Sequence, residues 1–147
     1  MKTFVYVAAL FVAAVSGASQ QRGDPVAIGK CTELVKTTFG SLVLSDAATK
    51  CATDAKVKDV KAIVGAKGPS AADAKAIVAS KVCATWFTGT VVPAVKKTAC
   101  VFTDPTTGTA AKPSTSNSKD FKWTLAQFVQ KASATKSAKA APAPKKP

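Results

Sequence analysis

Four cysteines constrain the fold of this chain more than any other feature of its sequence. They stand at Cys31, Cys51, Cys83 and Cys100, behind an N-terminal segment of the kind that exported proteins carry. Exported chains meet oxidising conditions, where an even number of cysteines is usually paired. We therefore expect two disulfide bonds, and the spacing alone leaves the three connectivities of four cysteines open. We expect no metal site, because the chain has no CxxC pair and no histidine.

The first 18 residues predict secretion. Lys2 supplies a positive start, residues 4–15 form an apolar run, and Ser16-Gly17-Ala18 offers small residues for cleavage. The run is shorter than the roughly 20 apolar residues that a membrane helix needs, and no later stretch approaches that length. We therefore expect a secreted, extracellular protein without a membrane anchor.

Composition divides the rest of the chain into an arm, a domain and a tail. Residues 19–26 predict a flexible polar arm that contains Arg22-Gly23-Asp24, and residues 27–132 have the apolar content of one small domain. Residues 131–147 carry five lysines and neither an acidic nor a large apolar residue. Such a segment cannot bury enough surface to offset the entropy lost on ordering. Residues 133–147 are therefore expected to be a disordered Lys/Ala/Pro tail.

Residues 27–132 predict a small, disulfide-stapled all-α domain of about five helices, because apolar residues recur there at helical spacing. The first helix should run from about Lys30 to Val43, with Leu34, Val35, Phe39 and Leu42 on one face. Ser70 with Asp73 has the pattern of a capping box that opens the next helix, in which Ala74, Ile77, Val78 and Val82 should face inward.

The last part of the domain predicts one possible short β-hairpin and a closing helix. Val101-Phe102-Thr103 is followed by Asp104-Pro105-Thr106-Thr107-Gly108, which places proline and glycine at turn positions. Residues 119–132 predict an amphipathic helix, since Phe121, Leu125, Phe128 and Val129 fall on one face. Pro93 should kink or end the helix in which it lies.

The formal charge of +13 is carried almost wholly by lysine, because Arg22 is the only arginine. Proteins that read nucleic acids depend on arginine forks, whereas scattered lysines give a diffuse attraction to anionic surfaces. We therefore expect no nucleic acid partner, but an anionic cell wall or membrane surface. The candidates for surface binding are Lys131, Lys136, Lys139, Lys145 and Lys146. Lysines that simply keep a small protein soluble are the alternative interpretation.

The sequence argues against an enzyme. Without histidine there is no Ser-His-Asp or Cys-His arrangement, and Glu33 is the only glutamate. The aspartates stand among lysines, where helix caps and surface pairs explain them. No glycine-rich phosphate cradle is present, so we expect no catalytic residue and no cofactor.

Several short motifs resemble the elicitin family of oomycetes. They are Leu44-Ser45-Asp46, Cys51-Ala52-Thr53-Asp54, Pro69, Cys83, Cys100 and Pro105-Thr106-Thr107-Gly108. Elicitins carry six cysteines, paired first to fifth, second to fourth and third to sixth. The four cysteines of this chain match the first, second, fourth and fifth, while Val78 stands in place of the third and no cysteine ends the last helix, where the sixth would be. The resemblance implies the pairs Cys31–Cys100 and Cys51–Cys83.

The resemblance also implies a function. Elicitins are non-enzymatic carriers that hold a sterol or fatty chain between helices, and some members trigger plant defence. For this chain that implies a sterol or fatty acid ligand and recognition by a host receptor. In the family a tyrosine lines the pocket, but Ala74 stands at the corresponding position of this chain. The absence of the tyrosine hydroxyl favours a different lipid or no ligand. The candidate pocket residues, each of which can also be ordinary core, are Leu34, Phe39, Val60, Ile63, Ile77, Phe87, Leu125 and Phe128.

A second class of function stays open. In this alternative the protein binds no ligand, and a stapled helical core displays the lysine-rich tail to an anionic cell wall or membrane. A tightly filled core would favour this alternative, whereas a connected apolar cavity of a few hundred cubic ångströms would favour the carrier.

Overall fold

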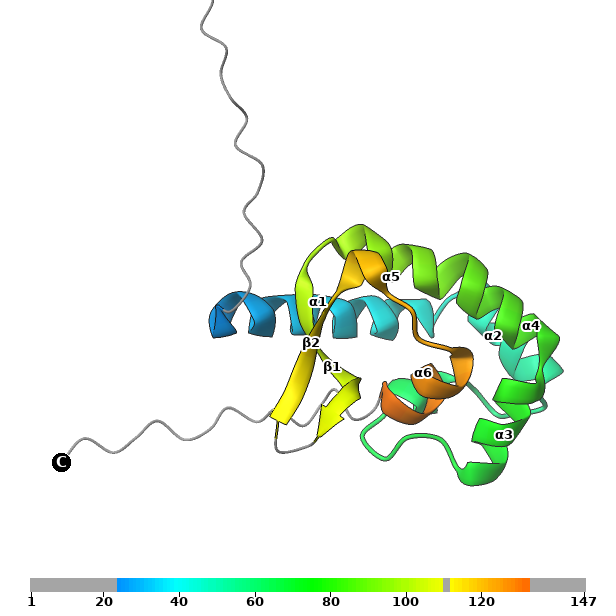
Figure 1. The fold of residues 1–147 in the computed structure, drawn as a ribbon. Coiled ribbons are helices and arrows are strands. Elements are labelled where there is room, and N and C mark those ends of the chain that lie inside the picture. The colour runs from blue at the N-terminus through cyan, green and yellow to red at the C-terminus, as the bar shows by residue number, and fades with distance from the viewer. Residues whose placement is uncertain (1–23, 110–111, 133–147) are drawn as a thin grey trace, which may run out of the picture.

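The computed structural model describes residues 24–109 and 112–132 (Figure 1). The described chain is mostly helical and carries one two-stranded antiparallel hairpin, so the predicted helical fold with a hairpin is confirmed and a strictly all-α description is too narrow. The elements are α1 (Pro25–Leu42), α2 (Asp46–Asp54), the 3-10 helix η1 (Lys61–Val64), α3 (Ala71–Ala79), α4 (Lys81–Trp86), the π-helix η2 (Phe87–Val91), α5 (Val92–Thr98), β1 (Val101–Thr109), β2 (Lys112–Asn117), the 3-10 helix η3 (Ser118–Asp120) and α6 (Leu125–Lys131).

Three predictions lie outside the described residues. These are the export signal, the first part of the arm, and the tail with Lys136, Lys139, Lys145 and Lys146. Within the described residues, no single helix is long and apolar enough to cross a membrane. By length and composition alone, α3 together with the helical segment Lys81–Thr98 would suffice, but the two are bent by 75° relative to each other.

Helix α1 begins five residues before its predicted start, because Asp24 caps it. The Asp24 carboxylate accepts a hydrogen bond from the Val26 N–H at 2.9 Å, and Pro25 occupies the first turn, where no N–H is needed. The buried face repeats every four residues through Cys31, Val35 and Phe39. Leu34 lies about 100° away from Val35 around the helix and is 49% exposed, so its predicted inward position is wrong.

Serine caps position the next three helices. Ser45, Ser70 and Ser80 accept the backbone N–H groups of Ala48, Asp73 and Cys83 at 3.2, 3.1 and 3.0 Å. Ser80 also donates to Asp54 at 2.6 Å, which ties the bend between α3 and α4 to the end of α2. Because this bend turns the chain, Val78 and Val82 lie on the surface and not, as predicted, in the core.

The helical segment Lys81–Thr98 continues past Pro93. Its middle, η2, is a π-helix that ends two residues before the proline, and α5 then begins with Pro93 in its first turn. A proline lacks the N–H that the helix would use, and the wider π turn is one way in which a helix accommodates the disruption. The helix ends at Ala99, which has a positive φ of 50°.

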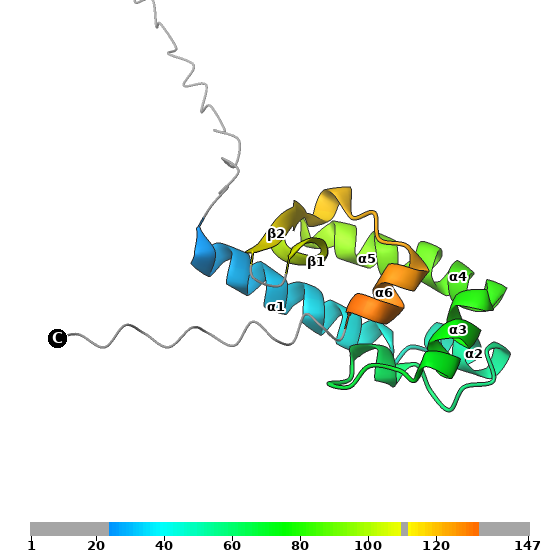
Figure 2. The same ribbon diagram turned by 60° about the horizontal axis from the view of Figure 1, so that its bottom comes forward.

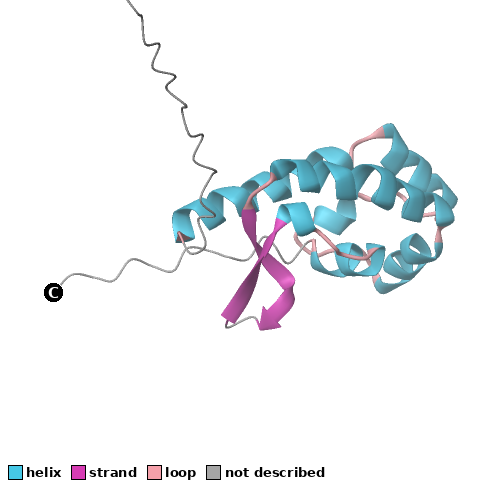
Figure 3. Ribbon diagram, turned by 45° about the horizontal axis from the view of Figure 1, so that its top comes forward, coloured by secondary structure: helices cyan, strands magenta, loops and turns pink. Residues whose placement is uncertain are grey.

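The hairpin is confirmed, but its predicted turn residues form a bulge instead. The strands pair regularly from Val101 with Asn117 to Asp104 with Ser114, and the register then shifts, so that Gly108 faces Pro113. Residues 105–107 therefore bulge out of β1, and Gly108 has a φ of 85°, which glycine adopts readily. Figure 3 shows the hairpin projecting from the helical body.

The closing helix α6 begins six residues later than predicted. Residues 121–124 are neither helix nor strand, and Phe121 and Trp123 are both buried. Thr124 and Gln127 then form a reciprocal capping box, with hydrogen bonds of 3.2 and 2.8 Å. Figure 2 shows α6 lying between α1 and α3.

The core is a cluster of aromatic rings around Phe128. Its ring centroid lies 4.9 Å from that of Phe39, 5.3 Å from Phe87 and 6.0 Å from Trp86. Two disulfides fasten the surrounding helices: Cys51–Cys83 joins α2 to α4, and Cys31–Cys100 joins α1 to the segment before β1. Both pairs implied by the resemblance are therefore confirmed.

Candidate functional site

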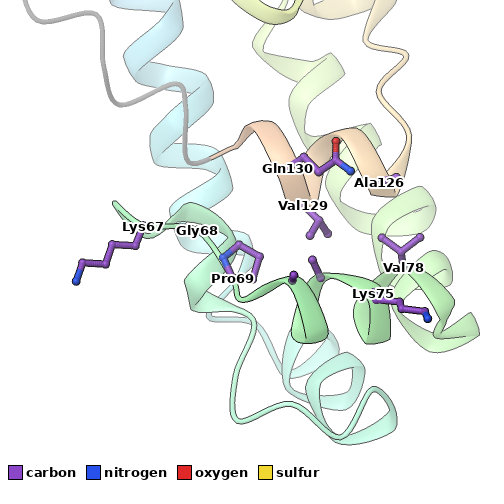
Figure 4. Close-up of a pocket in the computed structure, with 10 residues that line it drawn as sticks. Lys67, Gly68, Pro69, Lys75, Val78, Ala126, Val129 and Gln130 are labelled. Atoms are coloured by element: carbon purple, nitrogen blue, oxygen red, sulfur yellow. The ribbon is translucent and has the colours of Figure 1, made fainter.

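A groove between α3 and α6 has the size of a small-molecule site (Figure 4). Its volume is about 570 Å³. We call it the α3–α6 groove, and its lining residues are Lys67, Gly68, Pro69, Ala71, Ala74, Lys75, Val78, Ala126, Val129 and Gln130. Ligand pockets usually occupy about 300–1,000 Å³, so the groove could accommodate one small ligand.

The loop before α3 forms one end of the groove. Gly68 has a φ of 68°, and its N–H donates to the carbonyl oxygen of Gly65 at 3.2 Å, which closes a tight turn. Pro69 restricts the chain directly after this turn, and the Ser70 cap starts α3. The loop is therefore set by local geometry and holds Lys67 and Pro69 at the groove.

The floor of the groove is apolar, and it is formed by small side chains that face each other from two helices. Val129 is almost fully buried beneath it, Ala74 and Ala126 are half-buried, and Val78 is 42% exposed at its side. The alanines are too short to fill the space between the helices, so a hollow remains. Helices α3 and α6 pack against each other but leave this space open. No disulfide joins these two helices among the described residues.

The rim of the groove is positively charged. Figure 4 shows the side chains of Lys67 and Lys75 extending on opposite sides of the groove, with Gln130 above. No acidic residue lines the groove, and within the described part of the chain neither lysine forms an ion pair. The groove has no nucleophilic hydroxyl or thiol among its lining residues. Its chemistry therefore suits non-covalent binding of a ligand with an apolar body and a polar or anionic end.

The eight residues predicted to line a pocket do not line this groove. Seven of them are buried in the core: Phe39, Val60, Ile63, Ile77, Phe87, Leu125 and Phe128. The eighth, Leu34, is on the surface. The prediction selected large apolar side chains, and these fill space. The groove instead lies where the side chains are small, and the only sequence signal for it was the pair of departures from the elicitin pattern at Ala74 and Val78.

A second groove lies between α2 and the segment from α4 to η2. It has a volume of about 440 Å³ and is lined by Ala47, Lys50, Lys81, Val82, Thr85, Trp86, Gly89 and Thr90. The Trp86 side chain is buried, and its indole nitrogen has no hydrogen-bond partner in the part of the chain that the structure describes. None of the eight predicted pocket residues lines this groove either.

The one buried acidic side chain in the described residues, Asp104, has a structural role. Its carboxylate accepts hydrogen bonds from the Thr106 N–H at 2.8 Å, the Thr106 and Ser116 hydroxyls at 2.6 Å each, and Trp123 Nε1 at 3.1 Å. These bonds fasten both strands of the hairpin to the segment before α6. Residues 24–109 and 112–132 contain no group of three or more His, Cys, Asp or Glu side chains that could hold a metal ion.

No protein-family model, curated protein or solved structure matches this chain. The chemistry of the α3–α6 groove is therefore inferred from its own residues.

Proposed function

We propose that the protein is a secreted, non-enzymatic lipid carrier of the elicitin type, which holds one amphipathic lipid in the α3–α6 groove. The observation that carries this proposal is the combination of a small-residue apolar floor with two unpaired lysines at the rim. An apolar chain can lie on the floor while its head group stays at the positive rim, close to water.

The elicitin resemblance supports the same site. Two of the positions at which the chain departs from the family pattern, Ala74 in place of a tyrosine and Val78 in place of a cysteine, line the groove. Loss of a bulky ring enlarges the space, and loss of a cross-link leaves α3 and α6 free to separate when a ligand enters. In this proposal the groove replaces the enclosed pocket that the resemblance implied.

The residues at the rim favour a particular kind of lipid. Lys67 and Lys75 offer ammonium groups to a carboxylate or phosphate, and Gln130 is the only uncharged polar side chain in the lining. We therefore propose a single-chain lipid with an anionic head, such as a fatty acid. A sterol, whose only polar group is a hydroxyl, should bind less well.

Two disulfides in so small a domain are consistent with an extracellular protein. Export of the chain is part of the proposal, and it is inferred from the first 18 residues.

The carrier proposal can be tested with a matched pair of variants on α3. Ala74→Trp fills the groove, whereas Ala72→Trp places the same side chain on an exposed position of the same helix outside the lining. We expect a fluorescent fatty acid to bind the unmodified protein with a micromolar Kd. Ala74→Trp should raise that Kd at least about tenfold, which corresponds to about 1.4 kcal/mol, and Ala72→Trp should leave it unchanged.

The head group is tested in the same assay. The matched fatty alcohol and a fluorescent sterol should both bind more weakly than the acid. If none of the three lipids binds, or if both tryptophan variants bind alike, the carrier proposal is wrong.

Two observations favour the second candidate function, in which the protein binds an anionic surface without a lipid ligand. The first is the filled core, because seven of the eight residues predicted to line a pocket are packed inside it. The second is that the described residues contain a single ion pair, Lys36 with Glu33 at 2.7 Å, so most lysines are free to meet a polyanion. Lys131 is exposed in the last turn of α6, directly before the lysine-rich tail. Removal of residues 133–147 should abolish sedimentation with anionic vesicles or pectin in this alternative, and should leave the fatty acid Kd unchanged in the carrier proposal.

A further inference from the structure

The hairpin is unusually rich in hydroxyl side chains. Eight of the sixteen residues from 103 to 118 are serine or threonine, and Pro105 and Pro113 stand among them. Exported segments rich in Ser, Thr and Pro are common acceptors of O-linked sugars. Composition alone does not say which hydroxyl would react, but the hydrogen bonds of the structure do.

Most hydroxyl groups are already engaged inside the protein. On helices, Thr53 and Thr88 donate to the carbonyl oxygens four residues earlier, at 3.1 and 2.9 Å. In the hairpin, Ser116 donates to Asp104, and the hydroxyls of Thr107 and Ser114 bond to each other. A hydroxyl held in this way has to break its hydrogen bond before it can react.

Thr115 is the exception. Among the serines and threonines of residues 24–109 and 112–132, only Thr90, Thr103 and Thr115 have a hydroxyl without a hydrogen bond in the structure. Thr90 and Thr103 are half-buried, whereas Thr115 is exposed. The structure therefore leaves one described hydroxyl both free and accessible.

The backbone around Thr115 is accessible as well. Thr115 lies opposite Thr103, whose N–H donates to Thr32 on α1 at 2.9 Å and not to β2. The two threonines are therefore a non-hydrogen-bonded pair of the ladder, in which the N–H and C=O groups of both residues point away from the partner strand. Helix α1 covers that edge of β1, and no described residue hydrogen-bonds to Thr115 at the outer edge of β2.

We propose that Thr115 carries an O-linked sugar, added by a glycosyltransferase of the secretory route. The Thr115 hydroxyl oxygen attacks the anomeric carbon of a sugar held on a nucleotide diphosphate or a lipid phosphate. The new C–O bond forms as the sugar–phosphate bond breaks, the phosphate leaves with the bonding electrons, and the hydroxyl proton passes to a base of the transferase. An extended open edge suits such an enzyme, because an acceptor strand can pair with it.

A sugar at Thr115 would also protect the hairpin. The outer edge of β2 is an open template for pairing with another chain, and proteins commonly block such edges. The inference rests on the export that forms part of the proposed function, because these transferases act on exported chains. It does not depend on lipid binding.

The experiment uses the full chain expressed in a eukaryotic secreting host, once with its own first 18 residues and once with an established export signal in their place. The intact mass of the secreted protein should exceed the sequence mass by whole sugar residues. Fragmentation should place the sugar on Thr115. Thr115→Ala should lose it, Thr115→Ser should keep it, and the matched control Thr53→Ala, whose hydroxyl is hydrogen-bonded, should keep it too.

The outcomes separate the two proposals. If the chain leaves the cell only with the substituted signal, the export proposal is wrong, and the same sample still tests the sugar. An unmodified secreted protein would overturn the inference. So would a sugar found on Thr107 or on the tail, or one that persists in Thr115→Ala.

Discussion

At the scale of single residues, Asp104 shows how a buried charge can organise a small domain. It is 4% exposed, and it accepts four hydrogen bonds from three residues that lie in β1, in β2 and before α6. A buried carboxylate is tolerated only when such donors surround it. The hairpin and the segment that closes the core therefore depend on one side chain.

Asp104→Ala should lower the free energy of unfolding by about 3 kcal/mol, because it leaves the buried Trp123 Nε1 and the partly buried Ser116 hydroxyl without their acceptor. Urea denaturation measures the loss. The control is Asp59→Ala, since the exposed Asp59 carboxylate accepts only a local bond from the Lys61 N–H at 2.9 Å. Equal losses for the two variants would contradict the role given to Asp104.

At the scale of elements, helix starts follow their caps more closely than their apolar stripes. The sequence predicted a helix over 119–132, because Phe121, Leu125, Phe128 and Val129 share a helical face. The structure places Phe121 in a non-helical segment, and α6 starts after the Thr124 cap. Trp123 was the signal that conflicted with the helix, because it alternates with Phe121 and Leu125 as residues of an extended chain do.

Thr124→Ala should destabilise the protein by about 1 kcal/mol, the usual effect of removing an N-cap, because the Gln127 N–H then loses its acceptor. The measurement is the shift of the thermal midpoint. Thr124→Ser keeps the hydroxyl and should recover most of the loss. A helix that owed its start to the apolar stripe alone would be insensitive to both substitutions.

The sequence predicted the α3–α6 groove least well, and for a physical reason. A helical pattern identifies where side chains pack, and Phe39, Ile77 and Phe128 are indeed core residues. A groove is a deficit of side-chain volume between two elements, so it depends on how α3 and α6 lie against each other. Alanines at 71, 74 and 126 show that deficit only once the helices are placed.

At the scale of the whole molecule, the two disulfides are nested. The bridge Cys31–Cys100 spans 69 residues and encloses Cys51–Cys83, which spans 32. Chain-entropy arguments give about 4 kcal/mol for each bridge, slightly more for the longer one. Non-reducing urea denaturation of the double variants Cys51→Ala/Cys83→Ala and Cys31→Ala/Cys100→Ala should show both losses. Midpoints equal to that of the intact protein would mean that packing alone holds the domain.

Nesting also decides what a protease can remove. Each disulfide closes a ring of the chain, and a single cut in the exposed stretch around Lys56 and Lys58 falls inside both rings. The two fragments therefore stay covalently joined by the disulfides. Helix α6 lies beyond Cys100, outside either ring, while α3 lies inside both. One wall of the groove thus lies within both disulfide rings, and the other lies outside them. A clip between the hairpin and α6 would therefore separate α6, and with it Phe128 at the centre of the core, from the cross-linked part of the chain.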